Sequence, residues 1–208
     1  KLVMLMTVLK SFFFFLGAAC TCAFVVLCLW VDIHYWDYNI SELSLTEIVQ
    51  ELVLATIVVI HFLLAKQYKS MRYCNILIGG FFLAMLIREL DALFDLISHG
   101  SWVWFALIAA LAALINPLIH YRQTMEQLTQ YTRTPGYGML ISGLLAILVF
   151  SRLFGMQGLW QAILDDGYVR VVKNVVEEGS ESFGYMLCLT ASIGYYCNFR
   201  GTLGQEST

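Results

Sequence analysis

Six apolar segments, each long enough to cross a bilayer as a helix, account for most of this 208-residue chain. A membrane-spanning helix needs about 20 predominantly apolar residues. The segments cover approximately residues 7–31, 46–65, 73–97, 102–120, 136–156 and 172–199. Helices are expected rather than strands, because lipid offers an unpaired backbone no partner and runs such as SFFFFLGAAC do not alternate in polarity. The sequence therefore predicts an all-α, polytopic membrane protein, a single domain built as a six-helix bundle.

The composition agrees with this class and excludes others. Hydrophobic residues make up 60% of the chain and charged residues 13%, whereas soluble domains average about 45–50% and about 25%. The formal net charge is −3 and basic residues are few, so the electrostatic footprint of a nucleic-acid-binding protein is missing. The partner that the sequence indicates is the lipid bilayer, with other membrane subunits as a second class of partner.

The distribution of Lys and Arg predicts the orientation of the chain. With the N-terminus in the cytoplasm, eight of the 12 basic residues fall on the inner side, as the positive-inside rule requires. They are Lys1, Lys10, Lys66, Lys69, Arg72, Arg122, Arg133 and Arg200. Of the 15 acidic residues, only Glu126 and Glu206 join them. We therefore expect both termini to be cytoplasmic, and the acidic outer face favours a bacterial-type inner membrane.

Charged residues in and beside the spans are the main functional signal, because each costs about 2.5–3.5 kcal/mol at the centre of a membrane helix. Helical spacing and depth place nine of them in one layer of the outer leaflet, with Glu89 on another face of the third span. The nine are Glu47, Glu51, Arg88, Asp91, Asp95, Arg152, Lys173, Glu177 and Glu181. Solvated side chains that snorkel to the headgroups are the simpler explanation for the shallow members.

Six acids and three bases in this layer leave a surplus of acid, which can be balanced by raised pKa values, by water or by a bound cation. We therefore predict an outward-facing, carboxylate-rich, Arg-containing pocket that binds a cation, a proton or a polar head group. An accessory role in a larger membrane complex fits a small chain with short loops. A non-enzymatic function is favoured, since no HExxH or GxSxG motif occurs.

Two alternatives use the same residues differently. A metal-dependent membrane enzyme would bind a hard divalent cation through carboxylates such as Glu51, Asp91, Glu177 and Glu181. A b-type haem protein would use His61 and His120 as axial ligands, but their depths differ by roughly 6 Å at 1.5 Å per residue. A buried His61 bonded to a neighbouring side chain is the simpler expectation for that residue.

The outer connection at residues 157–171 carries a further local prediction. Leu159, Trp160, Ile163 and Leu164 fall near one helical face and are followed by two aspartates and Gly167. This pattern indicates a short amphipathic helix lying at the membrane interface.

Overall fold

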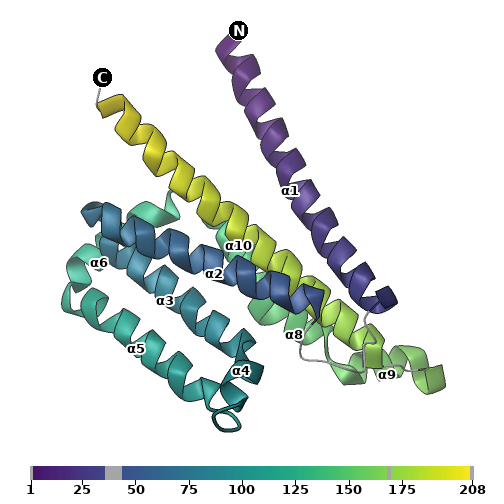
Figure 1. The fold of residues 1–208 in the computed structure, drawn as a ribbon. Helices are drawn as coiled ribbons and strands as arrows, with labels where there is room; N and C mark the ends of the chain where they lie inside the picture. The colour runs from purple at the N-terminus through teal and green to yellow at the C-terminus, as the bar shows by residue number, and fades with distance from the viewer. Residues whose placement is uncertain (1, 36–43, 168–169, 207–208) are drawn as a thin grey trace. The chain divides into compact units, whose positions relative to one another are not determined.

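The computed structural model describes residues 2–35, 44–167 and 170–206, and within these ranges the chain forms helices and no strand (Figure 1). The α-helices are α1 (Leu2–Tyr35), α2 (Leu45–Gln67), α3 (Arg72–Glu89), α4 (Asp91–Asp95), α5 (Trp102–Ile119), α6 (Tyr121–Thr132), α7 (Tyr137–Leu145), α8 (Ser151–Phe154), α9 (Gln157–Leu164) and α10 (Arg170–Glu206). Short 3₁₀ turns lie at Lys69–Met71 and Asp165–Gly167, and a π-helical segment, Ala146–Phe150, joins α7 to α8. The prediction of an all-α fold is confirmed.

Among the residues that the structure describes, five stretches of helix are long and apolar enough to cross a membrane. They are Met4–Tyr35, Leu45–Gln67, Lys69–Glu89, Trp102–Ile119 and Tyr137–Phe154, which correspond to the first five predicted spans. The sixth predicted span lies within α10, which has 37 residues and is not one of these five. Its first half carries charged and polar side chains that include the buried Glu181 and Ser182, so α10 shares with a membrane span its length rather than an apolar character.

The third predicted span differs from the helix that forms. The prediction extended it to residue 97, but α3 ends at Glu89 because Leu90 leaves the helical region with φ −83° and ψ 23°. Asp91 then accepts a hydrogen bond from the backbone N–H of Ala92 (2.7 Å), and α4 begins there as a separate short helix. The helical spacing of α3 therefore does not determine where the side chains after Leu90 point.

Two connections contain helices. The predicted amphipathic helix in the outer connection is present as α9. It ends at Leu164, because the next residue, Asp165, has a left-handed φ of 44°. The segment between the fourth and fifth predicted spans, residues 121–135, is largely occupied by α6. Thr124, Gln127 and Tyr131 form the buried face of α6, at the spacing of three and four residues that brings side chains to one side of a helix.

The chain folds into two compact units, one of Lys1–Thr46 with Gly143–Leu187 and one of Glu47–Ser142 with Cys188–Thr208. In the first unit, the end of α1 holds the start of α2. The buried carboxylate of Asp32 accepts hydrogen bonds from the backbone N–H groups of Leu45 and Thr46, both at 2.8 Å, and from the Thr46 hydroxyl at 2.5 Å. Asp32 thus satisfies two of the N–H groups that the first turn of a helix leaves unpaired.

In the second unit, α3 and α5 run side by side and in opposite directions (Figure 1). Gly80 makes this approach possible, because a Cβ built on it would lie only 2.1 Å from the Cβ of Ala113. Contact through small residues is the usual way in which membrane helices pack closely. In the first turn of α3, the backbone N–H groups of Tyr73 and Cys74 donate hydrogen bonds to the side-chain oxygen of Gln127, at 2.8 Å and 3.1 Å.

Candidate functional site

The nine predicted site residues divide between the two units. Arg152, Lys173, Glu177 and Glu181 belong to the first unit, and Glu47, Glu51, Arg88, Asp91 and Asp95 belong to the second. Each set is therefore described within its own unit.

In the first unit, the four residues form one ion-paired group, which we call the Arg152 cluster. The Arg152 guanidinium lies 2.7 Å from Glu177 through Nη1 and 2.5 Å from Glu181 through Nη2. Lys173 Nζ lies 2.5 Å from the second oxygen of Glu177, one helical turn away on α10.

Local backbone features bring α8 against α10 at this point. The π-helical segment 146–150 ends immediately before Ser151, and such segments shift the facing of the residues that follow and often occur at functional sites. The buried Ser151 hydroxyl lies 3.3 Å from Glu181. Gly155 allows the close approach, because a Cβ on it would lie 3.0 Å from the side chain of Glu177.

Burial within the Arg152 cluster is uneven. The Glu181 side chain retains only 8% of its exposure, whereas the Arg152 side chain is 43% exposed. A buried carboxylate is costly unless it is paired and hydrogen-bonded, so Glu181 depends on Arg152. Two acids and two bases give these four residues no formal net charge. Arg152 is the most exposed of the four side chains, and Glu181 is the most buried.

In the second unit, Arg88 pairs with Glu89, the next residue along α3. Glu51 on α2 is close enough to Glu89 for the two carboxylates to repel each other. Glu47 is half-buried near the start of α2.

Asp91 and Asp95 are exposed and stabilise the turn after α3. Asp95 accepts a hydrogen bond from the backbone N–H of Gly100 and one from His99 Nδ1, both at 2.8 Å. The hydrogen bond from Gly100, followed by that from His99, holds the pKa of Asp95 below its usual range. Both acids therefore accept hydrogen bonds from backbone N–H groups of the segment between α3 and α5.

The metal and haem alternatives gain no geometric support. Within residues 2–35, 44–167 and 170–206, no group of three or more His, Cys, Asp or Glu side chains is arranged to hold a metal ion. His61 is fully buried, with Nδ1 bonded to Asn75 Oδ1 (2.8 Å) and Nε2 at 3.1 Å from Ser192 Oγ. Both ring nitrogens are thus engaged by side chains, as in the simpler expectation.

Sequence reasoning missed several buried polar residues that organise the helices. Asp32 and Gln127 cap helices that start far from them in the chain, and Asn75 and Ser192 are the partners of His61. A signal for Asp32 was present, since it follows the buried Cys28 by four residues on the same helical face. Comparison of the chain with protein-family models, curated proteins and solved structures finds no match, so function is argued from geometry.

Proposed function

We propose that this chain is a six-span integral membrane protein with both termini in the cytoplasm, and that the Arg152 cluster binds a cation, a proton or a positively charged head group from the outer side. A bacterial-type inner membrane is the proposed location. The observation that carries the proposal is the pairing of one partly exposed arginine with two carboxylates on α10, one of them buried.

The physical basis is exchange of one cation for another. Arg152 is long and partly exposed, so its guanidinium can swing outward while its carboxylate partners stay on α10. An incoming cation then takes its place between Glu177 and Glu181, and a proton on Glu181 would serve the same purpose. Lys173 remains paired with Glu177 and limits the number of positive charges that the cluster accepts.

The unequal distribution of basic residues between the two predicted sides of the membrane supports the proposed orientation, with both termini in the cytoplasm. The cluster lies at the outer end of the fifth and sixth predicted spans when the basic connections face the cytoplasm. In this orientation, an entering cation meets the acidic side of the protein first, which raises its local concentration.

A role as an accessory subunit is supported by α1. Every residue from 4 to 17 is exposed, including four consecutive phenylalanines at 12–15. A membrane helix with so little contact to its own chain offers a face to another membrane protein. We expect a partner of fixed stoichiometry to remain bound in mild detergent and to be released when Phe12 and Phe15 are changed to Ala.

The binding proposal is tested by ligand-induced stabilisation. A ligand that binds only the folded state at 100 times its Kd adds about 2.7 kcal/mol to the free energy of unfolding. The purified protein in detergent is heated with Na⁺, Mg²⁺ or ethanolamine, and at least one cation should raise the unfolding temperature of the wild type. Glu177→Gln should abolish that shift, whereas Glu126→Gln, an exposed residue of α6, should retain it.

Glu181→Gln provides the second variant of the cluster and should also abolish the shift if it folds. The proposal fails if none of these cations stabilises the wild type, or if Glu177→Gln and Glu126→Gln respond to the cation equally.

A further inference from the structure

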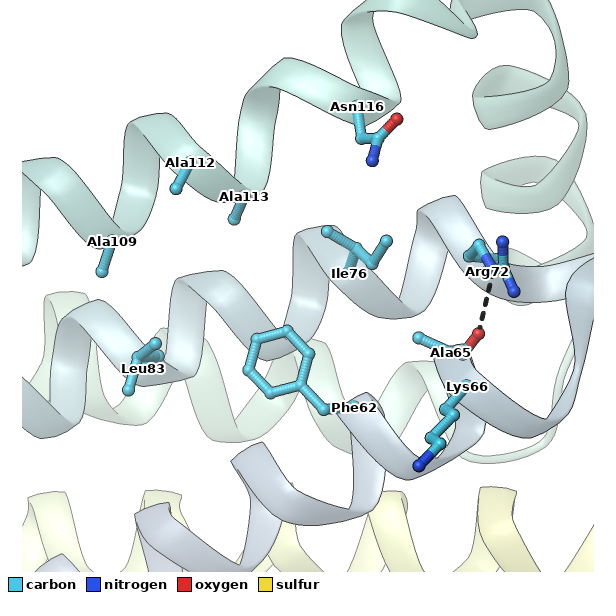
Figure 2. A pocket seen from close by; sticks show the side chains of 10 residues that line it. All are labelled: Phe62, Ala65, Lys66, Arg72, Ile76, Leu83, Ala109, Ala112, Ala113 and Asn116. Atoms are coloured by element: carbon cyan, nitrogen blue, oxygen red, sulfur yellow. Dashed lines mark hydrogen bonds between the residues drawn. The ribbon is translucent and has the colours of Figure 1, made fainter.

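A groove of about 560 Å³ runs along the second unit, bordered by α2, α3 and α5 (Figure 2). None of the residues that line it belongs to the Arg152 cluster. Phe62 of α2 and Ile76 and Leu83 of α3 form one side, and Ala109, Ala112 and Ala113 of α5 form the other. This part of the lining is entirely apolar.

Small side chains on α5 leave the space open. The alanines at 109, 112 and 113 and Asn116 follow the three- and four-residue spacing of one helical face. Ala113 contacts α3 at Gly80, so the two backbones approach closely there. Ala112 is exposed beside that contact and projects too little to fill the groove.

Positive charge is confined to one end of the groove. Lys66, Arg72 and Asn116 lie at that end, opposite Leu83 and Ala109 (Figure 2). Arg72 donates a hydrogen bond from Nε to the backbone oxygen of Ala65 (3.2 Å), which fixes the guanidinium at the mouth of the groove. None of the ten described residues that line the groove is acidic.

The length of the groove is close to the hydrocarbon thickness of one membrane leaflet. From Arg72 to Leu83 the α3 helix rises about 16 Å at 1.5 Å per residue, which is about half of the roughly 30 Å hydrocarbon core. The basic end coincides with the end of the second span, where Lys and Arg are expected to meet headgroups. An occupant of this groove therefore needs an anionic head and an apolar chain.

We propose that the groove binds one anionic phospholipid of the leaflet that contains Lys66. Its phosphate group lies between Lys66 and Arg72, and one acyl chain extends along the alanines of α5. Basic pockets between membrane helices on the cytoplasmic side are suited to acidic head groups, since each Lys or Arg near such lipids contributes about fivefold to binding. Two such residues predict a preference of up to about 30-fold over a zwitterionic lipid with the same acyl chains.

The test measures lipid affinity by native mass spectrometry of the full chain in detergent, with phosphatidylglycerol and phosphatidylcholine of identical acyl chains. The wild type should prefer phosphatidylglycerol by about 10- to 30-fold, and Lys66→Gln and Arg72→Gln should each lower that preference about fivefold. Lys69→Gln is the matched control, because Lys69 is exposed on the same predicted face of the membrane but does not line the groove. It should keep the wild-type preference.

Ala112→Leu tests the contribution of the apolar part of the groove separately from that of the basic residues. A leucine there fills the apolar part, so binding of both lipids should fall while Lys66 and Arg72 remain. Equal affinity of the wild type for the two lipids would overturn the proposal, as would an effect of Lys69→Gln equal to that of Arg72→Gln. Full displacement of phosphatidylglycerol by inorganic phosphate would also overturn it, because the acyl chain would then contribute nothing. Lys66 is exposed, so its variant should fold even if Arg72→Gln does not.

Discussion

Adding a single methyl group at Gly80 should loosen the packing of α3 against α5. A Cβ at this position would lie 2.1 Å from the Cβ of Ala113, well inside the roughly 3.5–4.0 Å at which two carbon atoms pack best. One helix must therefore shift by about 1.5 Å to restore ordinary contact. Overpacking of this kind typically costs about 1–3 kcal/mol.

Gly138→Ala is the matched control, because it makes the same chemical change in α7 where nothing lies within 4 Å of the new Cβ. Replacing Gly by Ala inside a helix stabilises it by about 0.5–1 kcal/mol. Gly138→Ala should show this gain alone, so Gly80→Ala should be less stable than Gly138→Ala by the overpacking cost of about 1–3 kcal/mol.

The exchange Gly80→Ala with Ala113→Gly moves the methyl group from one helix to the other. The nearest atom to the new Cβ is then the Cα of residue 113 at 3.6 Å, an ordinary contact. The double variant should recover to within about 0.5 kcal/mol of the wild type, since the two helix-propensity changes offset each other. Unfolding by SDS titration in mixed micelles, followed by tryptophan fluorescence, measures all four proteins. Equal stability of Gly80→Ala and Gly138→Ala, or no recovery in the double variant, would refute the packing argument.

Three further perturbations test other contacts. Asp32→Ala removes the carboxylate that caps α2 and should cost about 0.5–2 kcal/mol in SDS unfolding, and a cost no greater than for Asp32→Asn would contradict the capping role. Arg152→Met and Glu181→Gln should be non-additive in a double-mutant cycle by about 1–3 kcal/mol, because removing Arg152 alone strands a buried carboxylate; additive losses would exclude the ion pair. Asp95 has a lowered pKa, so its contribution to the turn is present above its unfolded-state pKa and is lost as pH falls through the lower folded-state pKa. Protection of the Gly100 amide from hydrogen exchange, expressed relative to the intrinsic exchange rate at each pH, should fall over that acidic range, and Asp95→Asn should remove this change in protection.

The spans were predictable because the membrane imposes a simple physical rule on sequence. A helix facing lipid must be apolar over about 20 residues, and the first five predicted segments meet that rule in the structure. The helix at 157–164 was also foreseen, since Leu159, Trp160 and Ile163 have helical spacing. The contact of Arg152 with Glu177 and Glu181 joins three residues that the sequence analysis placed at a common depth, but the pairing itself was not predicted.

The remaining errors arose where spacing along one helix does not determine position. Asp91 and Asp95 were assigned to the face of Arg88 on the assumption that the helix continued, but the break at Leu90 turns them toward the loop. Asp32 caps a helix that begins 13 residues later, and that contact depends on where α1 ends in space. Such long-range capping is decided by tertiary packing, which no periodicity in the sequence records.

The central claim is that the Arg152 cluster opens to the outer side of the membrane. Met156 is exposed and follows Gly155, which contacts Glu177, so Met156→Cys places a thiol beside the cluster. Glu126→Cys places one on the side predicted to be cytoplasmic. Intact cells are treated with a membrane-impermeant maleimide, and mass spectrometry identifies the labelled peptide. The account predicts labelling at position 156 and none at 126 until the cells are opened; labelling of 126 but not 156 in intact cells would contradict it.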